Sequence, residues 1–185
     1  YAENAGISTL VVGVSGGIDS AVTSTICAMT KMRTILLNMP IHQNQNQYLL
    51  SDQHIQWLKA KWDNVESKTV DLTATFDLLL KDLEEEDISE LAAANSRARL
   101  RMTTLYAIAT SNNGIVVGTG NKVEDFGIGF FTKHGDGGVD ISPIADLYKT
   151  EVYALAQTLG IIEVIRQAAP TDGLWDDERT DEEQM

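Results

Sequence analysis

Short apolar runs alternate along this chain with longer segments whose apolar residues recur every three or four positions. The runs predict strands at 8–14 (STLVVGV), 33–39 (RTILLNM), 67–72 (SKTVDL, the weakest of the four) and 114–120 (GIVVGTG). The longer segments predict helices at 19–31, 50–62, 87–111 and 147–160. Within the helix at 87–111, one apolar stripe is formed by Ala98, Met102, Leu105 and Ala109.

Strands that alternate with helices predict an α/β fold, here a Rossmann-like, doubly wound parallel sheet with helices on both faces. No repeat or break in composition divides the chain, so we expect residues 1–185 to form a single domain. Ligands of such sheets bind beyond the carboxyl ends of the strands. Two glycine-containing segments, SGGIDS (15–20) and GTGNKVED (118–125), directly follow predicted strands, and we expect both to border one crevice.

Composition and charge exclude several classes of function. The formal net charge of -13 disfavours a general nucleic-acid binder, which needs a basic surface. No apolar stretch approaches the ~20 residues of a membrane-spanning helix, and no signal peptide is visible, so we expect a cytoplasmic protein without a membrane partner. The single cysteine, Cys27, excludes an internal disulfide and is predicted to lie on a buried helix face. The histidines show no spacing typical of a transition-metal site.

The segment SGGIDS combines features of a phosphate-binding loop with an acidic residue. Gly16 and Gly17 allow backbone N–H groups to approach an anion, and the following helix adds its positive end. A plain turn followed by a helix cap explains these glycines equally well. Asp19 favours a nucleotide bound with Mg²⁺, because a carboxylate beside a polyphosphate requires an intervening cation. Glu124 is the expected second carboxylate, and Asp125 competes for that role.

Several longer segments resemble one enzyme family. GVSGGIDS (13–20) is similar to the signature of the N-type ATP pyrophosphatases, which have the adenine nucleotide alpha hydrolase-like fold and cleave ATP between its α- and β-phosphates. Four further segments together resemble NAD synthetase: NSRARLRM (95–102), VVGTGNKVE (116–124), GFFTKHGDGGVDISPIADLYKTEV (129–152) and APTDGLWDDERTDEEQM (169–185). The resemblance implies ATP-dependent amidation of deamido-NAD to NAD through an adenylated nicotinate carboxylate, with release of AMP and pyrophosphate.

The resemblance also implies roles for individual residues. It implies that ATP is contacted by Gly13, Val14, Ser15, Gly16, Gly17, Ile18, Asp19, Ser20, Thr119, Lys149 and Thr171. It assigns deamido-NAD to Arg99, Lys133 and Asp140, Mg²⁺ to Asp19 and Glu124, and catalysis to Asp19, Lys149 and Asp140. Members of the family are usually homodimers with additional segments at both ends, so we expect residues 1–185 to lack N- and C-terminal parts of the family's domain.

Three assignments stay open. Arg97 and Arg101 share a helix face, whereas Arg99 points about 200° away from both, so Arg99 is taken from the resemblance alone. Asp140 is alternatively a cap or turn residue before Pro143. The alternative functions are another N-type ATP pyrophosphatase, such as a GMP synthetase-like amidotransferase domain, and a non-catalytic adenine-nucleotide-binding module.

The nitrogen source is expected to be free ammonia. An enzyme that uses glutamine needs a nucleophile, commonly cysteine, on a separate glutaminase domain. Cys27 lies on an apolar helix face without a basic neighbour suited to activate it.

Overall fold

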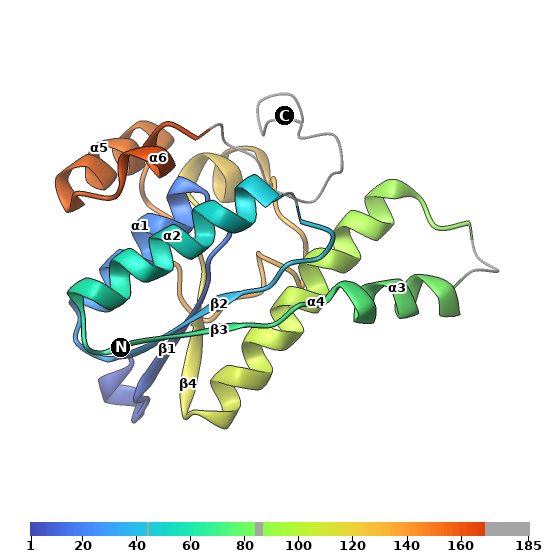
Figure 1. The fold of residues 1–185 in the computed structure, drawn as a ribbon, viewed down its shortest axis with the longest axis horizontal. Helices are drawn as coiled ribbons and strands as arrows, with labels where there is room; N and C mark the ends of the chain where they lie inside the picture. The colour runs from blue at the N-terminus through green and yellow to red at the C-terminus, as the bar shows by residue number, and fades with distance from the viewer. Residues whose placement is uncertain (44, 84–86, 169–185) are drawn as a thin grey trace.

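Four parallel strands form the centre of the molecule, in the order β3-β2-β1-β4 (Figure 1). The computed structural model describes residues 1–43, 45–83 and 87–168, and its strands are β1 (Thr9–Gly13), β2 (Arg33–Asn38), β3 (Val65–Thr69) and β4 (Gly114–Val117). β1 pairs in parallel with β2 on one side and with β4 on the other. Because β1 and β4 are neighbours, the segments that follow them leave the sheet side by side at its carboxyl edge.

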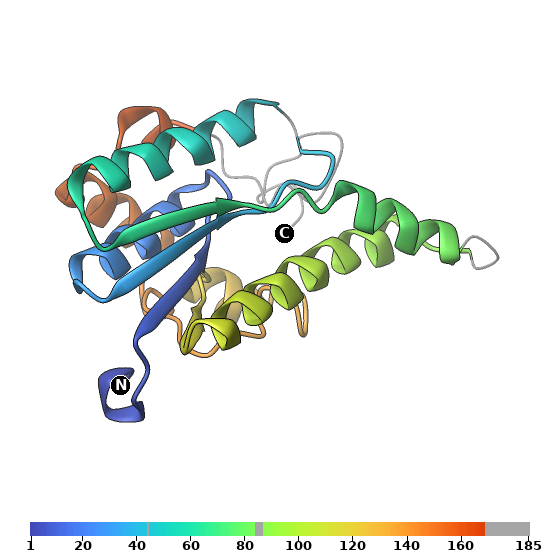
Figure 2. The same ribbon diagram turned by 60° about the horizontal axis from the view of Figure 1, so that its bottom comes forward.

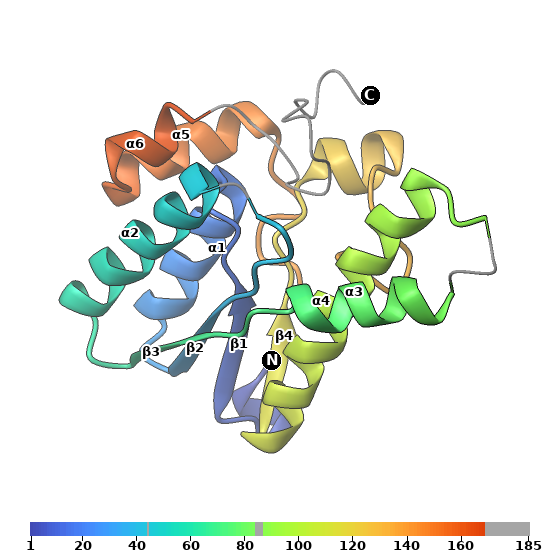
Figure 3. The same cartoon turned by 45° about the vertical axis from the view of Figure 1, so that its right-hand side comes forward.

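Helices cover both faces of the sheet (Figure 3). One face carries α1 (Ile18–Met29) and α2 (Gln45–Lys61), and α5 (Lys149–Leu159) and α6 (Glu163–Arg166) pack against α1. The other face carries α4 (Glu90–Ser111), against which α3 (Thr73–Asp82) packs. Two short turns complete the described elements, the 3-10 turn η1 (Glu3–Ala5) and the π-helical turn η2 (Val123–Ile128). The doubly wound α/β fold predicted from the sequence is confirmed.

The strands divide the core into two apolar layers, because successive side chains of a strand point to opposite faces. Leu10 and Val12 of β1 pack in the cluster that contains Leu58 of α2. Val11, which lies between them, packs in the cluster that contains Leu105 of α4. All five side chains are at most 6% exposed. The run at 8–14 is therefore apolar at consecutive positions because both faces of β1 are covered.

The structure differs from the sequence-based prediction at short or weakly patterned elements. The sequence analysis does not predict α3, α6, η1 or η2. In α3 the signal was present but short, because Phe76, Leu79 and Leu80, at spacings of three and four, form a stripe of buried and partly buried residues. α2 begins at Gln45, before the predicted start at residue 50. α4 begins at Glu90, because the Ser89 hydroxyl accepts a hydrogen bond from the Ala92 N–H (3.2 Å) and caps the helix there.

The α3–α4 pair extends away from the sheet, whereas the N-terminal turn lies near the opposite end of the molecule (Figure 2). Within the described residues, every helix is too short or too polar to cross a membrane.

Candidate functional site

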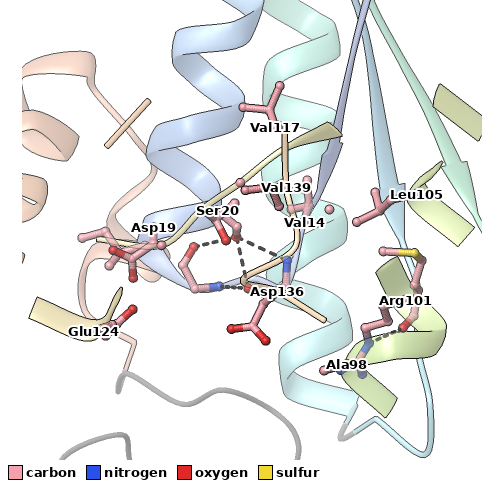
Figure 4. A pocket seen from close by; sticks show the side chains of 18 of the residues that line it. Val14, Asp19, Ser20, Ala98, Arg101, Leu105, Val117, Glu124, Asp136 and Val139 are labelled. Atoms are coloured by element: carbon pink, nitrogen blue, oxygen red, sulfur yellow. Dashed lines mark hydrogen bonds between the residues drawn. The ribbon is translucent and has the colours of Figure 1, made fainter. Parts of the chain in front are cut away.

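The segments that follow β1 and β4 border one pocket at the carboxyl edge of the sheet (Figure 4). The end of β1 and the segment after it contribute Gly13, Val14, Ser15, Gly17, Ile18, Asp19 and Ser20. The segment after β4 contributes Gly118, Thr119, Gly120, Glu124 and Asp125. The opposite wall comes from α4, with Ala98, Arg101, Met102 and Leu105, and α5 adds Lys149. The pocket lies where ligands of parallel sheets bind, so the two segments do border one crevice.

The loop between β1 and α1 is held by its own hydroxyl groups. Ser20 Oγ donates to the Gly17 carbonyl (2.9 Å) and accepts from the Ser15 N–H (3.2 Å), and Ser15 Oγ accepts from the Gly17 N–H (3.2 Å). Gly16 has a φ of 92°, and a Cβ there would lie 2.9 Å from the carbonyl oxygen of Gln47, so the position requires glycine. No side chain caps the N-terminus of α1. Its positive end is thus available to an anion in the pocket.

Lys149 connects the two acidic residues that the sequence singles out. Its Nζ lies 2.6 Å from Oδ2 of Asp19 and 2.9 Å from Oε1 of Glu124. Lys149 begins α5, Asp19 lies in the first turn of α1, and Glu124 lies in η2. The three side chains are 17–25% exposed. The structure therefore brings these residues together, with one ammonium group between two carboxylates.

Burial and charge shift the pKa values in this group. Burial raises the pKa of the Asp19 carboxyl, and the Lys149 ammonium and the Asn121 amide reduce that rise without cancelling it. For Lys149, burial acts to lower the pKa, but the carboxylates of Asp19 and Glu124 outweigh it and the pKa is raised. Lys149 consequently keeps its proton at neutral pH.

Asn121 belongs to the same group, although the sequence analysis does not single it out. Its side chain is fully buried, and Nδ2 donates to Oδ1 of Asp19 (3.1 Å). Its Oδ1 accepts from the backbone N–H groups of Val123 (3.0 Å) and Glu124 (3.2 Å). The sequence signal was its place in GTGNKVED after a strand, but asparagine in a loop is typical of an ordinary turn.

Asp125 and Asp136 add two more carboxyl groups to the pocket wall. The Asp125 carboxyl lies so close to Gly120 that a Cβ there would overlap it. Burial, followed by the negative charges of Asp136, Glu124 and Asp19, raises the pKa of Asp125 to about 6. Glu124 shares a cation with Asp19, so the geometry favours Glu124 over Asp125 as the second metal ligand, an assignment that stays a prediction.

The three residues that the resemblance assigns to deamido-NAD are described, but none of them lines this pocket. Arg99 Nε donates to the carbonyl oxygen of Lys133 (3.1 Å), and both residues are exposed. Asp140 Oδ2 accepts from the Val116 N–H (2.8 Å), and Oδ1 accepts from the Tyr106 hydroxyl (3.1 Å). These bonds tie Asp140 to β4 and α4, so its side chain has a structural role, but neither bond is the cap or turn before Pro143 of the alternative interpretation. Its contact with deamido-NAD and its catalytic role stay predictions.

Arg101, rather than Arg99, is the arginine of α4 that lines the pocket. Its Nε donates to the carbonyl oxygen of Met39 (3.0 Å), just after β2 (Figure 4). Ala98 belongs to the predicted apolar stripe, and a residue three positions later lies beside it on the helix surface. That spacing was the signal that could have identified Arg101. Thr119 lines the pocket as well, whereas Thr171 lies outside the described residues.

Comparison with known proteins identifies the family of the chain. Residues 1–185 match the family model described as NAD synthase. The chain belongs to the NAD synthase family. It is 39% identical over 186 residues to an NH(3)-dependent NAD(+) synthetase of Methanosarcina acetivorans, a match that covers 99% of this chain and 71% of the relative. The NH(3)-dependent NAD(+) synthetase of Carboxydothermus hydrogenoformans is 41% identical over 187 residues, covering 99% of this chain and 74% of the relative.

Solved structures of related proteins share the fold of this NAD synthase family member. The NMN synthetase of Francisella tularensis superposes with a TM-score of 0.90 at 36% identity, covering 98% of this chain and 74% of that one. The NH3-dependent NAD synthetase of Campylobacter jejuni superposes with a TM-score of 0.80 at 32% identity, covering 89% and 69%. Family membership confirms the resemblance in the sequence and identifies the reaction as the ATP-dependent amidation of deamido-NAD to NAD.

Proposed function

We propose that the pocket binds ATP together with Mg²⁺ and that the chain amidates deamido-NAD with free ammonia. The observation that carries the proposal is the Lys149 ammonium, which bonds Asp19 and Glu124 beside an uncapped helix N-terminus. A polyphosphate needs several positive groups, and this pocket offers the ammonium, the end of α1 and the loop N–H groups. If residues 15–20 formed only a plain turn, the structure would have no need to bring Lys149, Asp19 and Glu124 together beside it.

Asp19 and Glu124 fit a Mg²⁺ ion because they are hard oxygen donors that already share one cation. Within the described residues, no group of three or more His, Cys, Asp and Glu side chains is arranged to hold a metal. A Mg²⁺ ion held here would therefore take further ligands from ATP phosphates and water, as this ion commonly does. When bound, it would supply charge stabilisation at the phosphates of ATP.

The reaction divides into an adenylation and an amidation. In the adenylation, an oxygen of the nicotinate carboxylate attacks the α-phosphorus of ATP, the bond to the bridging α–β oxygen breaks, and pyrophosphate leaves. In the amidation, ammonia attacks the acyl carbon, AMP leaves with the carboxylate-derived oxygen, and one proton is released. In this proposal, the loop from Gly13 to Ser20 holds the pyrophosphate, and Lys149 offsets negative charge that develops at the α-phosphate.

Free ammonia is the proposed nitrogen source because Cys27 is unsuited to release ammonia from glutamine. The Cys27 side chain is 2% exposed, and burial raises the pKa of its thiol to about 12. A thiol in that state supplies almost no thiolate at neutral pH. The relatives from Methanosarcina acetivorans and Carboxydothermus hydrogenoformans are named NH(3)-dependent enzymes. From the family resemblance we also expect a cytoplasmic homodimer.

The experiment measures AMP and NAD formation by the purified chain from ATP, Mg²⁺ and deamido-NAD, with either ammonium chloride or ammonia-free glutamine. We expect product with ammonium and none with glutamine. The Francisella tularensis relative is an NMN synthetase, so nicotinate mononucleotide is the second acceptor to test. Product from glutamine alone would contradict the nitrogen assignment, and amidation of the mononucleotide in preference to deamido-NAD would contradict the acceptor.

A further inference from the structure

We propose that Asn121 is a positioning residue that holds the carboxylates of Asp19 and Glu124 at the spacing at which they share one cation. The proposal rests on the function proposed above for these two carboxylates. Asn121 bonds both partners at once: Nδ2 donates to Oδ1 of Asp19 (3.1 Å), and Oδ1 accepts from the N–H of Glu124 (3.2 Å). One side chain thereby links the segment after β1 to the segment after β4.

The two oxygens of Asp19 have different partners. Oδ1 accepts from Asn121, and Oδ2 accepts from Lys149. Because bonds to both oxygens restrict rotation of the carboxylate about its Cβ–Cγ bond, the group is oriented as well as located. Lys149 belongs to the cation-binding group itself, whereas Asn121 bonds Asp19 from the buried side, where its 0% exposure excludes solvent as a replacement partner.

Asn121 also determines where η2 begins. Its Oδ1 accepts from the N–H groups of Val123 (3.0 Å) and Glu124, and its carbonyl oxygen accepts from the N–H of Asp125 (3.0 Å). These bonds place the first turn of η2 so that the Glu124 side chain reaches Lys149. A π-helical turn is rare and is frequently found at functional sites, which agrees with a turn that presents a carboxylate to the pocket.

A carboxamide is the side chain that meets both requirements, because it donates through nitrogen and accepts through oxygen. Serine at position 121 would retain an acceptor for the backbone N–H groups at the start of η2, but its shorter side chain would lose the donor to Asp19. Alanine would lose both. The two substitutions therefore separate a role in orienting Asp19 from a role in capping η2.

The test compares Asn121→Ser and Asn121→Ala with the unmodified chain of 185 residues. The first measurement is the rate of AMP formation from ATP, Mg²⁺, deamido-NAD and ammonium. The second, made without nucleotide or metal, is the pKa of Asp19 from a ¹³C NMR titration of aspartate-labelled chain, assigned with Asp19→Asn. We expect both variants to form AMP about 10- to 100-fold more slowly, the usual loss for partners of ligating side chains, and both to raise the pKa of Asp19.

Asn64→Ala is the matched control. Asn64 likewise links two segments through its carboxamide: Nδ2 donates to the carbonyl oxygens of Ala28 (3.0 Å) and Met32 (2.7 Å), but Asn64 does not line the pocket. We expect the control to lose folding stability while its AMP formation and the pKa of Asp19 stay unchanged.

A role confined to capping η2 would leave Asn121→Ser like the unmodified chain in both measurements, because serine caps about as well as asparagine does and adds no charge beside Asp19. That result would overturn the proposal. If Asn121→Ala does not fold, Asn121→Ser decides alone. If the unmodified chain forms no AMP, the proposed function fails, and the titration of Asp19 still decides the positioning role.

Discussion

Nζ of Lys149 lies 2.6 Å from Oδ2 of Asp19, although the two residues are 130 positions apart in the chain. The topology explains how they meet. Asp19 follows β1, Glu124 follows the neighbouring strand β4, and α5, which begins at Lys149, packs on α1. Two carboxylates share one ammonium, and Asp125 and Asp136 line the same pocket. We therefore expect this acidic pocket to bind ATP that arrives with a divalent cation in preference to ATP alone.

Asp19→Asn is expected to slow AMP formation by about 100-fold or more, because it removes the charge that orients the cationic groups around the phosphates. The shape of the side chain is kept, so we expect far-UV circular dichroism and the unfolding transition to show a folded chain. Release of AMP and pyrophosphate at saturating Mg²⁺ provides the measurement. A near-normal rate would contradict the role of Asp19.

Glu124→Gln and Asp125→Asn form the comparison that identifies the second carboxylate. Glu124 bonds Lys149 (2.9 Å), so we expect Glu124→Gln to be the more damaging of the two in the same assay. A normal rate for Glu124→Gln together with an inactive Asp125→Asn would transfer the role to Asp125.

Lys149→Met is expected to lower the free energy of unfolding, because it leaves two poorly exposed carboxylates without their ammonium. Breaking a buried pair typically costs about 3 kcal/mol or more, and urea denaturation at pH 7 measures the loss. Added Mg²⁺ should restore part of it, since a ligand of the folded state stabilises that state. The control is Lys122→Met, whose Nζ lies 4.5 Å from the ring centroid of Tyr148 and whose loss should cost only about 1 kcal/mol. Equal stability of the two variants would contradict the buried cluster.

Asp125→Asn is expected to stabilise the chain at neutral pH but not in acid. The pKa of Asp125 is about 6 in the folded chain, above its ordinary value of 3.8. Between these values the folded state binds more protons than the unfolded state, so the stability due to Asp125 is present in acid and is lost as the pH rises to about 6. The variant should gain stability above pH 6, by clearly less than the ~3 kcal/mol of the full shift because solvent screens this partly exposed group, and nothing below pH 4. Urea denaturation across this range measures the difference, and a gain that is independent of pH would contradict the explanation.

His54→Gln is expected to change how the free energy of unfolding depends on pH, in the direction opposite to that of Asp125→Asn. His54 is fully buried, its Nε2 lies 3.0 Å from Ser24 Oγ, and burial lowers its pKa from 6.5 to about 4. The unfolded state therefore binds more protons in this window, and the unmodified chain loses stability as the pH falls from about 6.5 to 4. His54→Gln should be less stable at pH 7 but should lose less on acidification. The control is His134→Asn, at an exposed position whose φ of 64° asparagine tolerates.

The elements that could be predicted from the sequence are those in which burial determines the order of apolar and polar residues. Both faces of β1 are covered, and α4 carries an apolar stripe, so strand and helix are recognisable from residue order alone. The meeting of Asp19 and Glu124 was predictable because parallel strands present their carboxyl ends at one edge. The bond from Asn121 to Asp19 was not predictable, because it depends on a π-helical turn that spans residues of no clear periodicity. Likewise, the choice of Arg101 over Arg99 depends on which face of α4 packs on the sheet.

Lys133→Ala is expected to raise the KM for deamido-NAD more than the KM for ATP. Lys133 is exposed, and its carbonyl oxygen accepts a hydrogen bond from Arg99 (3.1 Å), outside the wall of the phosphate-loop pocket. Arg101→Ala is the comparison, because Arg101 lines that pocket and should affect ATP more. Steady-state kinetics with each substrate varied in turn separates the two effects. A rise confined to the KM for ATP in Lys133→Ala would show that this lysine serves the other substrate.

The long separation between Asp19 and Lys149 also affects how the protein matures. A chain is synthesised from its N-terminus at about 5–20 residues per second, so the 130 positions between them correspond to about 6–26 s on the ribosome. During that interval the phosphate loop already exists, but the ammonium that neutralises its carboxylate has not yet been made. A nascent chain thus carries the loop without this ammonium, and the group of Asp19, Glu124 and Lys149 is completed only when α5 docks on α1.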